Sequence, residues 1–421
     1  MDAKGYGNIP EILFDWITFL VKALPLRSVP TFIELLIGAM LTPTGFVTDA
    51  WLMVAMKRHW TSYFKWLQKG KWSWVALAQQ LGQLLTQWCP NEQWYLAIDD
   101  TLVLRSSKKA PSSQFHHMHG NKANRPQFVR GQCWVSLSAI VKGQKQAWSI
   151  PLISRLTRAC GNGNKLVTAG ILLRVMRSFF TGATVLMDSW YMRGTLIASL
   201  QGMGYHVIGQ VRKDTALYDV PERTGKRGRP RKYGEKYTPE RVTNLEETCA
   251  NVTIYGRQQS LRYRTVIAKA RFLDGQLVKV VWVQFENEDG SLKPARLLLT
   301  TRTNMSGIDI IKAYAKRWSI EPMFHQLKNR WGWNETWQQS RQVLHRWVQI
   351  ISLSYALVQL LTYWKESAGQ EMHLDIPWRK HAPITAGLVR LKLQRNLQQV
   401  AVRDWWDVKS RIFKPPARAI E

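Results

Sequence analysis

The spacing of hydrophobic residues predicts an all-helical N-terminal segment. Apolar positions in residues 1–90 recur every three or four residues, which is the spacing of one face of a helix. Prolines and Gly70 interrupt the pattern, so several short helices are expected rather than one long one. The predicted helices are Glu11–Ala23, Val29–Met40, Phe46–Met56, Thr61–Gln68 and Ser73–Trp88.

The hydrophobic pattern becomes strand-like from Gln93 onward. Three predicted strands follow one another directly, and helices and strands then alternate. This order favours a mixed sheet with helices on both faces. The predicted strands are Trp94–Val103, Gly131–Val141, Gln146–Ile153, Ala183–Met187 and His206–Val211, with helices at Lys165–Phe180 and Met192–Gln201.

Residues 212–300 break this order with a polar, basic segment followed by further strand-like runs. We interpret them as a β-rich insertion, with strands at Ala250–Tyr255, Leu261–Ala270, Gln276–Phe285 and Ala295–Thr301. A long helix over Ile308–Asn329 and a helical segment over 337–366 return the chain to the first sheet. The prediction is an α/β protein with a helical domain over 1–90, a mixed-sheet domain over 91–211 and 301–366, and a basic tail over 367–421 for dimerisation or DNA contact.

The charge balance points to a polyanionic partner. Lys and Arg number 59 against 29 acidic residues, a formal net charge of +30, and the excess is spread through a chain that also holds 21 Trp. Neutralising the phosphates of a nucleic acid, with release of its counterions, is the natural use of such a charge. We therefore expect the partner to be double-stranded DNA.

The cysteines and the apolar stretches indicate a cytoplasmic protein. The four cysteines lie far apart, without a C-x-x-C pair or a histidine at zinc spacing, which is typical of thiols in a reducing compartment. Charged residues and prolines interrupt Ile12–Met40, and Val348–Trp364 is shorter than a membrane-spanning helix. We expect buried helices in both places and no membrane contact.

One segment groups four functional side chains at helical spacing. Tyr314, Arg317, Glu321 and Lys328 form the pattern Y-x2-R-x3-E-x6-K, and on a helix at about 100° per residue they fall within an arc of roughly 60°. The carboxylate of such a stripe could bind a metal ion while the cations bind neighbouring phosphates. The alternative is a solvated helix face with an Arg317–Glu321 ion pair. Pro322 predicts a kink just after Glu321.

Two aspartates stand at the ends of apolar strands. Asp100 follows Tyr95-Leu-Ala-Ile-Asp, and Asp188 follows Val-Leu-Met. Carboxylates at the ends of buried strands are costly unless they share a cation. Together with Glu321 they offer three hard oxygen ligands, which suit a pair of Mg²⁺ ions engaged in phosphoryl transfer.

This order of acids resembles the DDE transposases of bacterial insertion sequences. The closest group is the cut-and-paste one with the YREK signature, and the resemblance covers about residues 90–330. It implies an RNase H-like catalytic domain with a β-rich insertion. Leu96-Ala-Ile-Asp99-Asp100-Thr101 resembles the first-Asp motif, whose ligand precedes Thr, which favours Asp100. Asp99 is the alternative, because adjacent strand residues face opposite ways.

The resemblance also implies a mechanism. Asp100, Asp188 and Glu321 would bind Mg²⁺, with Mn²⁺ as a substitute. Tyr314, Arg317 and Lys328 would contact phosphates at the transposon end. The N-terminal module would bind terminal inverted repeats, the DNA would be cut by hydrolysis, and the freed 3′-OH would attack target DNA. A homodimer would bring two ends together, in the nucleoid of a bacterial cytoplasm.

Two other motifs have alternative interpretations. Arg227-Gly-Arg229-Pro, followed by Arg231 and Lys232, has the form of an AT-hook that enters a narrow minor groove. The alternative is a basic loop with unspecific phosphate contacts. His116-His-Met-His119 is better explained as a loop near substrate than as a zinc site, because no fourth ligand has matching spacing.

Two other functions remain open. One is an RNase H-like nuclease that cuts DNA without joining ends. The other is a non-catalytic DNA-binding protein derived from a transposase, which the presence of all three acids disfavours.

Overall fold

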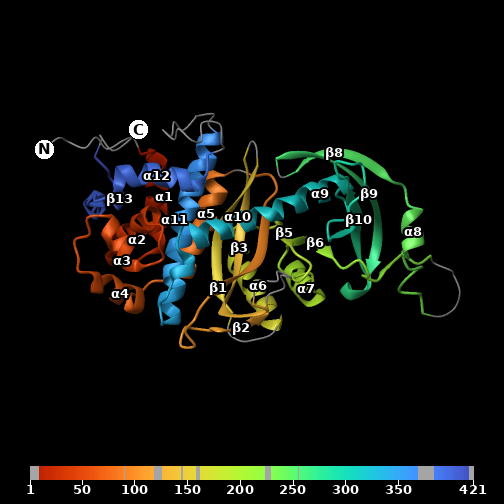
Figure 1. Ribbon diagram of the computed structural model, residues 1–421, viewed down its shortest axis with the longest axis horizontal. Helices are drawn as coiled ribbons and strands as arrows, with labels where there is room; N and C mark the ends of the chain where they lie inside the picture. The colour runs from red at the N-terminus through yellow and green to blue at the C-terminus, as the bar shows by residue number, and fades with distance from the viewer. Residues whose placement is uncertain are drawn as a thin grey trace.

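The computed structural model describes residues 9–89, 91–117, 126–143, 146–157, 162–222, 229–254, 256–367 and 384–416. A single eleven-stranded sheet forms its centre, with a bundle of helices packed at one end (Figure 1). No helix in these ranges is long and apolar enough to cross a membrane.

The N-terminal segment is helical, as the hydrophobic pattern predicts. Its helices are α1 (Glu11–Leu20), α2 (Val29–Leu41), α3 (Val47–Met53), α4 (Trp60–Lys69) and α5 (Trp74–Trp88). Helix α2 is apolar on nearly all sides and is buried accordingly. The long helix α11 (Arg341–Ser367) packs against α2, α4 and α5 and also against the sheet, so it joins the helical bundle to the sheet.

The predicted mixed sheet is confirmed and has an RNase H-like arrangement. Strands β1 (Tyr95–Leu104), β3 (Phe128–Lys142) and β4 (Ala147–Leu156) pair antiparallel, in the order β4-β3-β1. Strands β5 (Thr184–Met187) and β6 (His206–Val211) continue the sheet parallel to β1.

Connections between the strands place helices over the sheet. Helix α6 (Asn162–Met176) leads from β4 to β5, and α7 (Gly194–Gly202) leads from β5 to β6. A short additional strand, β2 (Gln114–His117), pairs with β3 inside the segment that the sequence indicates as a loop.

The β-rich insertion extends the same sheet. Strand β11 (Arg296–Thr300) pairs antiparallel with β6, and β10 (Gln276–Phe285) and β9 (Arg257–Ala270) follow it. The outer members are β8 (Thr248–Ile254), β7 (Leu217–Tyr218) and the short helix α8 (Pro239–Thr243). Helix α8 lies at the right of Figure 1. The insertion is therefore continuous with the first strands through backbone hydrogen bonds.

The predicted long helix over Ile308–Asn329 is wrong in one respect. It consists of α9 (Gly307–Ala315) and α10 (Ile320–Asn329), separated by a 3₁₀ turn at Lys316–Ser319. Pro322 has no N–H to donate to the carbonyl four residues earlier, so the regular ladder fails before Glu321 rather than after it.

The C-terminal tail packs back onto the N-terminal helices. It contains α12 (Ala386–Leu397), a 3₁₀ turn at Val402–Trp405, and the small strands β12 (Trp406–Asp407) and β13 (Ile412–Phe413). Helix α12 contacts α2 and α11, while Phe14 of α1 lies 5.1 Å, ring to ring, from Phe413. The two ends of the chain thus meet in one helical bundle (Figure 1).

Candidate active site

The strand register places Asp99 beside Asp188. Strands β1 and β5 run parallel, with Tyr95 opposite Thr184 and Ala97 opposite Leu186. Continuing that register past the end of β5 brings Asp99, in the middle of β1, opposite Asp188. Paired side chains on adjacent strands point to the same face of a sheet, so Asp99 and Asp188 share a face.

Arg317 connects Asp99 to Glu321. Its guanidinium donates from Nη1 to Oδ2 of Asp99 at 2.9 Å and from Nη2 to Oε1 of Glu321 at 3.1 Å. Asp99 is mostly buried, whereas 51% of the Glu321 side chain is exposed. The 3₁₀ turn and α10 thus carry an acid over the same face of the sheet as Asp99.

The acids on this face are held in a partly desolvated setting. Burial and the neighbouring charge of Asp188 raise the pKa of Asp99 to about 7, although Arg317 opposes the shift. Burial also raises the pKa of Asp188, against the effect of its backbone hydrogen bonds and of Arg317. Burial is the main cause of both shifts, and Arg317 offsets it only in part.

A tight turn orients Asp188. Its Oδ1 accepts hydrogen bonds from the backbone N–H of Trp190 at 3.0 Å and of Tyr191 at 3.1 Å. Aspartate commonly caps its own following residues in this way. The turn fixes the carboxylate at the carboxyl end of β5.

Asp100 points to the opposite face of β1. Its carboxylate accepts hydrogen bonds from Lys165 Nζ at 2.7 Å, from Tyr191 Oη at 3.0 Å and from Cys133 Sγ at 3.5 Å. The sheet therefore separates Asp100 from Arg317 and Glu321. The assignment of Asp100 as a metal ligand stays a prediction. The register places the alternative, Asp99, beside Asp188, and Arg317 joins Asp99 to Glu321.

The other members of the Y-x2-R-x3-E-x6-K pattern occupy different settings. The Tyr314 ring centroid lies 6.0 Å from the Arg317 guanidinium carbon. Lys328 is half-buried on α10, and burial lowers its pKa.

The AT-hook-like segment lies partly outside the described residues, which exclude Arg227. Arg229 and Arg231 are exposed. Lys232 forms an ion pair with Asp274, and its carbonyl accepts a hydrogen bond from Lys269 Nζ at 3.0 Å. This end of the segment is thereby attached to the turn between β9 and β10.

The histidine motif is described only in part. His116 Nε2 lies 3.2 Å from the Gly131 carbonyl, in β2, and His119 is outside the described residues. Within the parts of the chain that the structure describes, no three His, Cys, Asp or Glu side chains are close enough to hold a metal ion.

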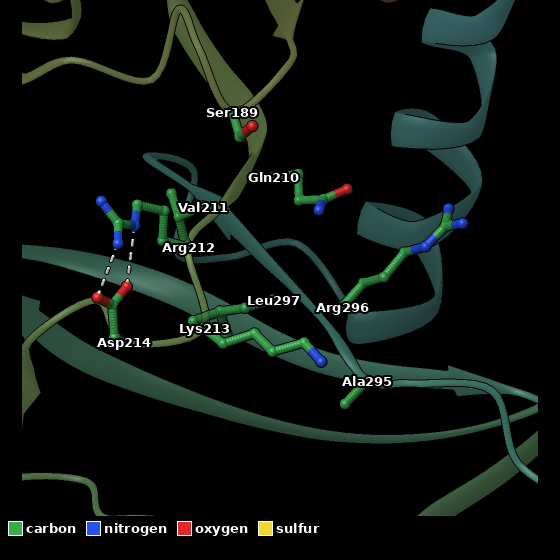
Figure 2. A pocket seen from close by; sticks show the side chains of 9 residues that line it. All are labelled: Ser189, Gln210, Val211, Arg212, Lys213, Asp214, Ala295, Arg296 and Leu297. Carbon is green, nitrogen blue, oxygen red and sulfur yellow. Dashed lines mark hydrogen bonds and ion pairs between the residues drawn. The ribbon is translucent and has the colours of Figure 1, made fainter. Parts of the chain in front are cut away.

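A cationic cavity of about 350 Å³ adjoins Asp188 (Figure 2). Ser189, the residue after Asp188, contributes to its wall, and Lys213 and Arg296 come to it from the β6–β7 connection and from β11. Arg212 forms an ion pair with Asp214, its Nε 3.2 Å from Oδ1. Lys213 and Arg296 are exposed, and their side chains have no ion pair or hydrogen bond within the described residues. The full lining is Ser189, Gln210, Val211, Arg212, Lys213, Asp214, Ala295, Arg296 and Leu297.

A second cavity continues this basic surface. It has a volume of about 410 Å³, shares Ser189 and Arg212 with the first, and adds Arg193 and Arg271. These cations come from separate elements with no common motif, so sequence patterns could not identify them. Only the pairing of β6 with β11 brings Lys213 and Arg296 to one cavity.

The molecule is thus an α/β protein with a nuclease-like mixed sheet, in which an acid in the middle of β1 lies beside an acid that follows the parallel strand β5. The sequence profile of the family described as "DDE superfamily endonuclease" matches residues 34–266, more than half of the chain. The chain belongs to this family. The matched region includes Asp99, Asp100 and Asp188 and ends before Glu321.

Comparisons with solved structures and with curated proteins do not refine this family assignment. A NurA nuclease from Sulfolobus solfataricus is similar over 62% of this chain and 81% of its own, with 10% identity and a TM-score of 0.23. At that TM-score the likeness carries no argument about fold or function. No curated protein matches the sequence.

Proposed function

We propose that this protein is a DNA transposase that cuts at the ends of a mobile element and joins them to target DNA. The observation that supports the proposal best is the position of Asp99 beside Asp188, with Arg317 joining Asp99 to Glu321, on a chain of the DDE superfamily endonuclease family. These acids come from distant parts of the sequence, and a bound ion would have to draw them closer together, because no three acids of the described residues are within ion-holding distance.

We assign these three acids as the ligands of Mg²⁺, for which Mn²⁺ can substitute. The donor chemistry fits, because Mg²⁺ prefers a few carboxylates completed by water and substrate phosphate. The burial of Asp99 beside Asp188 also fits, because a bound cation would offset the cost of burying a carboxylate. When bound, such ions activate the attacking oxygen and stabilise the leaving one.

The residues of the chain itself supply positioning. Arg317 holds Asp99 and Glu321 toward each other, and the exposed Glu321 can turn from Arg317 to a metal. The turn at Asp188 keeps Oδ1 fixed by two N–H groups. The three acids are therefore partly arranged before substrate binds, which reduces the reorganisation needed for catalysis.

The basic surface next to Asp188 would hold the DNA strand beside the scissile bond. Lys213 and Arg296 lie in the cavity that begins at Ser189, so phosphates there would lie next to the acids. Tyr314, Lys328, Arg229 and Arg231 would contact the backbone further along, and Arg227 and Lys232 complete the segment assigned to the minor groove. The N-terminal helices would bind the inverted repeats.

End joining distinguishes a transposase from the alternative, an RNase H-like nuclease that only cuts. Two element ends must be brought together before both can be inserted, so we propose that a homodimer assembles on paired ends. A non-catalytic DNA-binding protein would bind the same DNA and would not need the arrangement of acids.

The test uses the full-length protein with DNA carrying paired element ends and Mg²⁺. We expect nicking at the ends and, with pre-cut ends, transfer of the 3′-OH to a target plasmid. Asp188→Ala and Glu321→Gln should retain DNA binding and lose both reactions. Glu288→Gln is the matched control, because it removes an exposed acid in the β10–β11 loop.

Nicking without strand transfer would support the nuclease alternative. Unchanged nicking by Asp188→Ala would exclude the proposed site.

A further inference from the structure

A third cavity lies beside the first residues of β1, away from the acids. Its volume is about 900 Å³, and its walls come from β1, the β3–β4 hairpin, α9, α10 and α11. Tyr95, which lines it, precedes Asp99 by four residues, or about 13 Å along a strand. Small-molecule sites typically have volumes of about 300–1,000 Å³, so this cavity is large enough for a ligand of its own.

Positive charge predominates in this cavity. Its described lining holds four cations, Lys142, Arg302, Lys312 and Lys316, and one acid, Asp309. The carboxylate of Asp309 accepts a hydrogen bond from Ser306 Oγ at 2.6 Å. The ammonium groups of the three lysines have no ion pair or hydrogen bond within the described residues. The protein therefore leaves this charge uncompensated, and an anion in the cavity would be stabilised.

Lys316 is held at the wall of the cavity by an aromatic ring. It is half-buried, and its Nζ lies 4.2 Å from the centroid of the Tyr95 ring. Burial lowers the pKa of Lys316, and the nearby charge of Lys142 lowers it further. Lys312 stands four residues before Lys316, which brings the two side chains to the same side of the helical backbone. Like charges at this spacing repel each other, so a bound polyanion would relieve the repulsion.

Two glutamines in the same cavity have unpaired amide atoms. Gln359 of α11 is 2% exposed and lines the cavity. Its Oε1 accepts a hydrogen bond from Tyr355 Oη at 3.0 Å, while its Nε2 has no partner within the described residues. The buried Oε1 of Gln326, on α10, has no partner in the described part of the chain either. An unpaired donor and an unpaired acceptor at one cavity match the edge of a nucleobase, which carries both kinds of group.

Aromatic side chains add a surface on which a base can stack. Trp148 and Trp318 contribute indole rings to the cavity, and 48% of Trp318 is exposed. Aromatic side chains stack on bases with little dependence on which base it is. The cavity thus combines flat aromatic surface, hydrogen-bonding groups for a base edge and an excess of cations.

We infer that this cavity binds a free nucleoside di- or triphosphate, with its phosphates on the lysines and its base against Trp318 and the two glutamines. A phosphate chain brings several negative charges on one small ligand, whereas each nucleotide of a DNA strand brings one. Four cations that converge on a single cavity therefore suit the free nucleotide better than a strand of DNA. Because the cavity is separate from the acids, the inference does not depend on the proposed function.

The primary test is isothermal titration calorimetry of the full-length protein with ATP and with inorganic triphosphate, both in metal-free buffer. Lys316→Gln should weaken the binding of both ligands by about tenfold, because it removes a charge-assisted contact with phosphate. Lys22→Gln is the matched control, since Lys22 Nζ also lies over an aromatic ring, 4.9 Å from the centroid of Phe19, and does not line the cavity. That control should leave both affinities unchanged.

A second lysine variant separates the loss of a contact from a loss of folding in Lys316→Gln. Lys312 is exposed on α9, so Lys312→Gln leaves the packing around Tyr95 unchanged. It should weaken the binding of both ligands by about fivefold. If both lysine variants bind ATP as tightly as Lys22→Gln does, the inference is wrong.

A further pair of variants tests recognition of the base. Gln326→Leu should weaken ATP binding by about fivefold, through the loss of one neutral hydrogen bond, and should leave the affinity for inorganic triphosphate unchanged. Gln338→Leu is the matched control, because Gln338 is also half-buried, has a buried Oε1 that is unpaired within the described residues, and does not line the cavity. Equal effects of Gln326→Leu on ATP and triphosphate would contradict a nucleotide site.

Two other results would overturn the inference by placing the ligand differently. A wild-type protein that binds a short single-stranded oligonucleotide through Lys316, without saturable binding of ATP, would assign the cavity to a DNA strand. Loss of ATP binding in the double variant Lys213→Gln with Arg296→Gln, but not in Lys316→Gln, would place the nucleotide on the basic surface next to Asp188.

Discussion

Arg403→Gln should destabilise the helical bundle, because it leaves a buried carboxylate without its cation. Glu34, in the centre of α2, has no exposed surface, and its Oε2 lies 3.1 Å from Arg403 Nη1 of the C-terminal tail. Tyr63 Oη donates to the same oxygen at 3.0 Å. Arg403 is thus the only cation that the described residues place on Glu34, and it comes from the opposite end of the chain.

The size of the destabilisation follows from the distance between Glu34 and Arg403 and from the burial of Glu34. At 3.1 Å and an effective dielectric constant of about 20, the Coulomb attraction is about 5 kcal/mol. The hydrogen bond from Tyr63 remains, and the Arg403 side chain is still 18% exposed. We therefore expect the free energy of unfolding to fall by about 3 kcal/mol, the lower end of the range for breaking a buried pair.

The effect should depend on pH in a defined direction. Burial raises the pKa of Glu34, and Arg403 opposes that shift, so the pKa should rise further in Arg403→Gln. A carboxyl group whose folded pKa is raised destabilises the folded state progressively as the pH rises above its unfolded pKa, and fully once the pH exceeds the folded pKa. The loss should therefore be largest near pH 8 and should shrink as the pH falls toward about 5 and Glu34 takes up a proton.

The assay is urea unfolding followed by tryptophan fluorescence at both pH values. Lys57→Gln is the matched control, since it breaks the neighbouring surface pair with Asp404, whose side chains are 53% and 51% exposed. The free energy of unfolding of that control should fall by less than about 1 kcal/mol. Equal losses in the two variants, or a loss in Arg403→Gln that does not change with pH, would refute the reasoning.

Three further predictions concern DNA, metal and backbone. The double variant Lys213→Gln with Arg296→Gln should reduce the slope of log Kd against log[salt] by about 1.8, because each phosphate that the protein no longer neutralises contributes about 0.9. The slope is measured by fluorescence anisotropy, and an unchanged slope would place the DNA elsewhere. Chelation with EDTA should abolish nicking while gel-shift affinity for end DNA is retained, and nicking that survives chelation would exclude a metal mechanism. Gly332→Ala should lower the free energy of unfolding, measured with urea, by about 2 kcal/mol or more. Gly332 has φ of 68°, and an added Cβ would lie 1.9 Å from Gly45 N. An unchanged free energy of unfolding would show that this loop relaxes freely.

Much of the fold follows from local patterns. The bounds of β6 and β10 agree with the predicted strands His206–Val211 and Gln276–Phe285, because turn residues bracket clear apolar runs. The tail helix α12 and the strand β2 do not follow from such patterns. Each depends on packing against distant segments, α2 and α11 for the helix and β3 for the strand.

The candidate site is only partly predictable from the sequence. The alternation of a strand shows that Asp99 and Asp100 point to opposite faces, but β1 is largely buried on both, so its own pattern cannot identify the face that meets Glu321. That choice depends on the register with β5 and on the hydrogen bond with Arg317. The break at Lys316–Ser319 likewise depends on Pro322, whose effect extends backward along the chain.

The measurement that tests the central claim most directly is anomalous diffraction from crystals of the wild-type protein soaked with Mn²⁺. We expect a peak about 2.1 Å from carboxylate oxygens of Asp99 and Asp188, with Glu321 turned away from Arg317 toward the metal and Asp100 still bound to Lys165 and Tyr191. A peak bound by Asp100, with Asp99 retained on Arg317, would contradict the account.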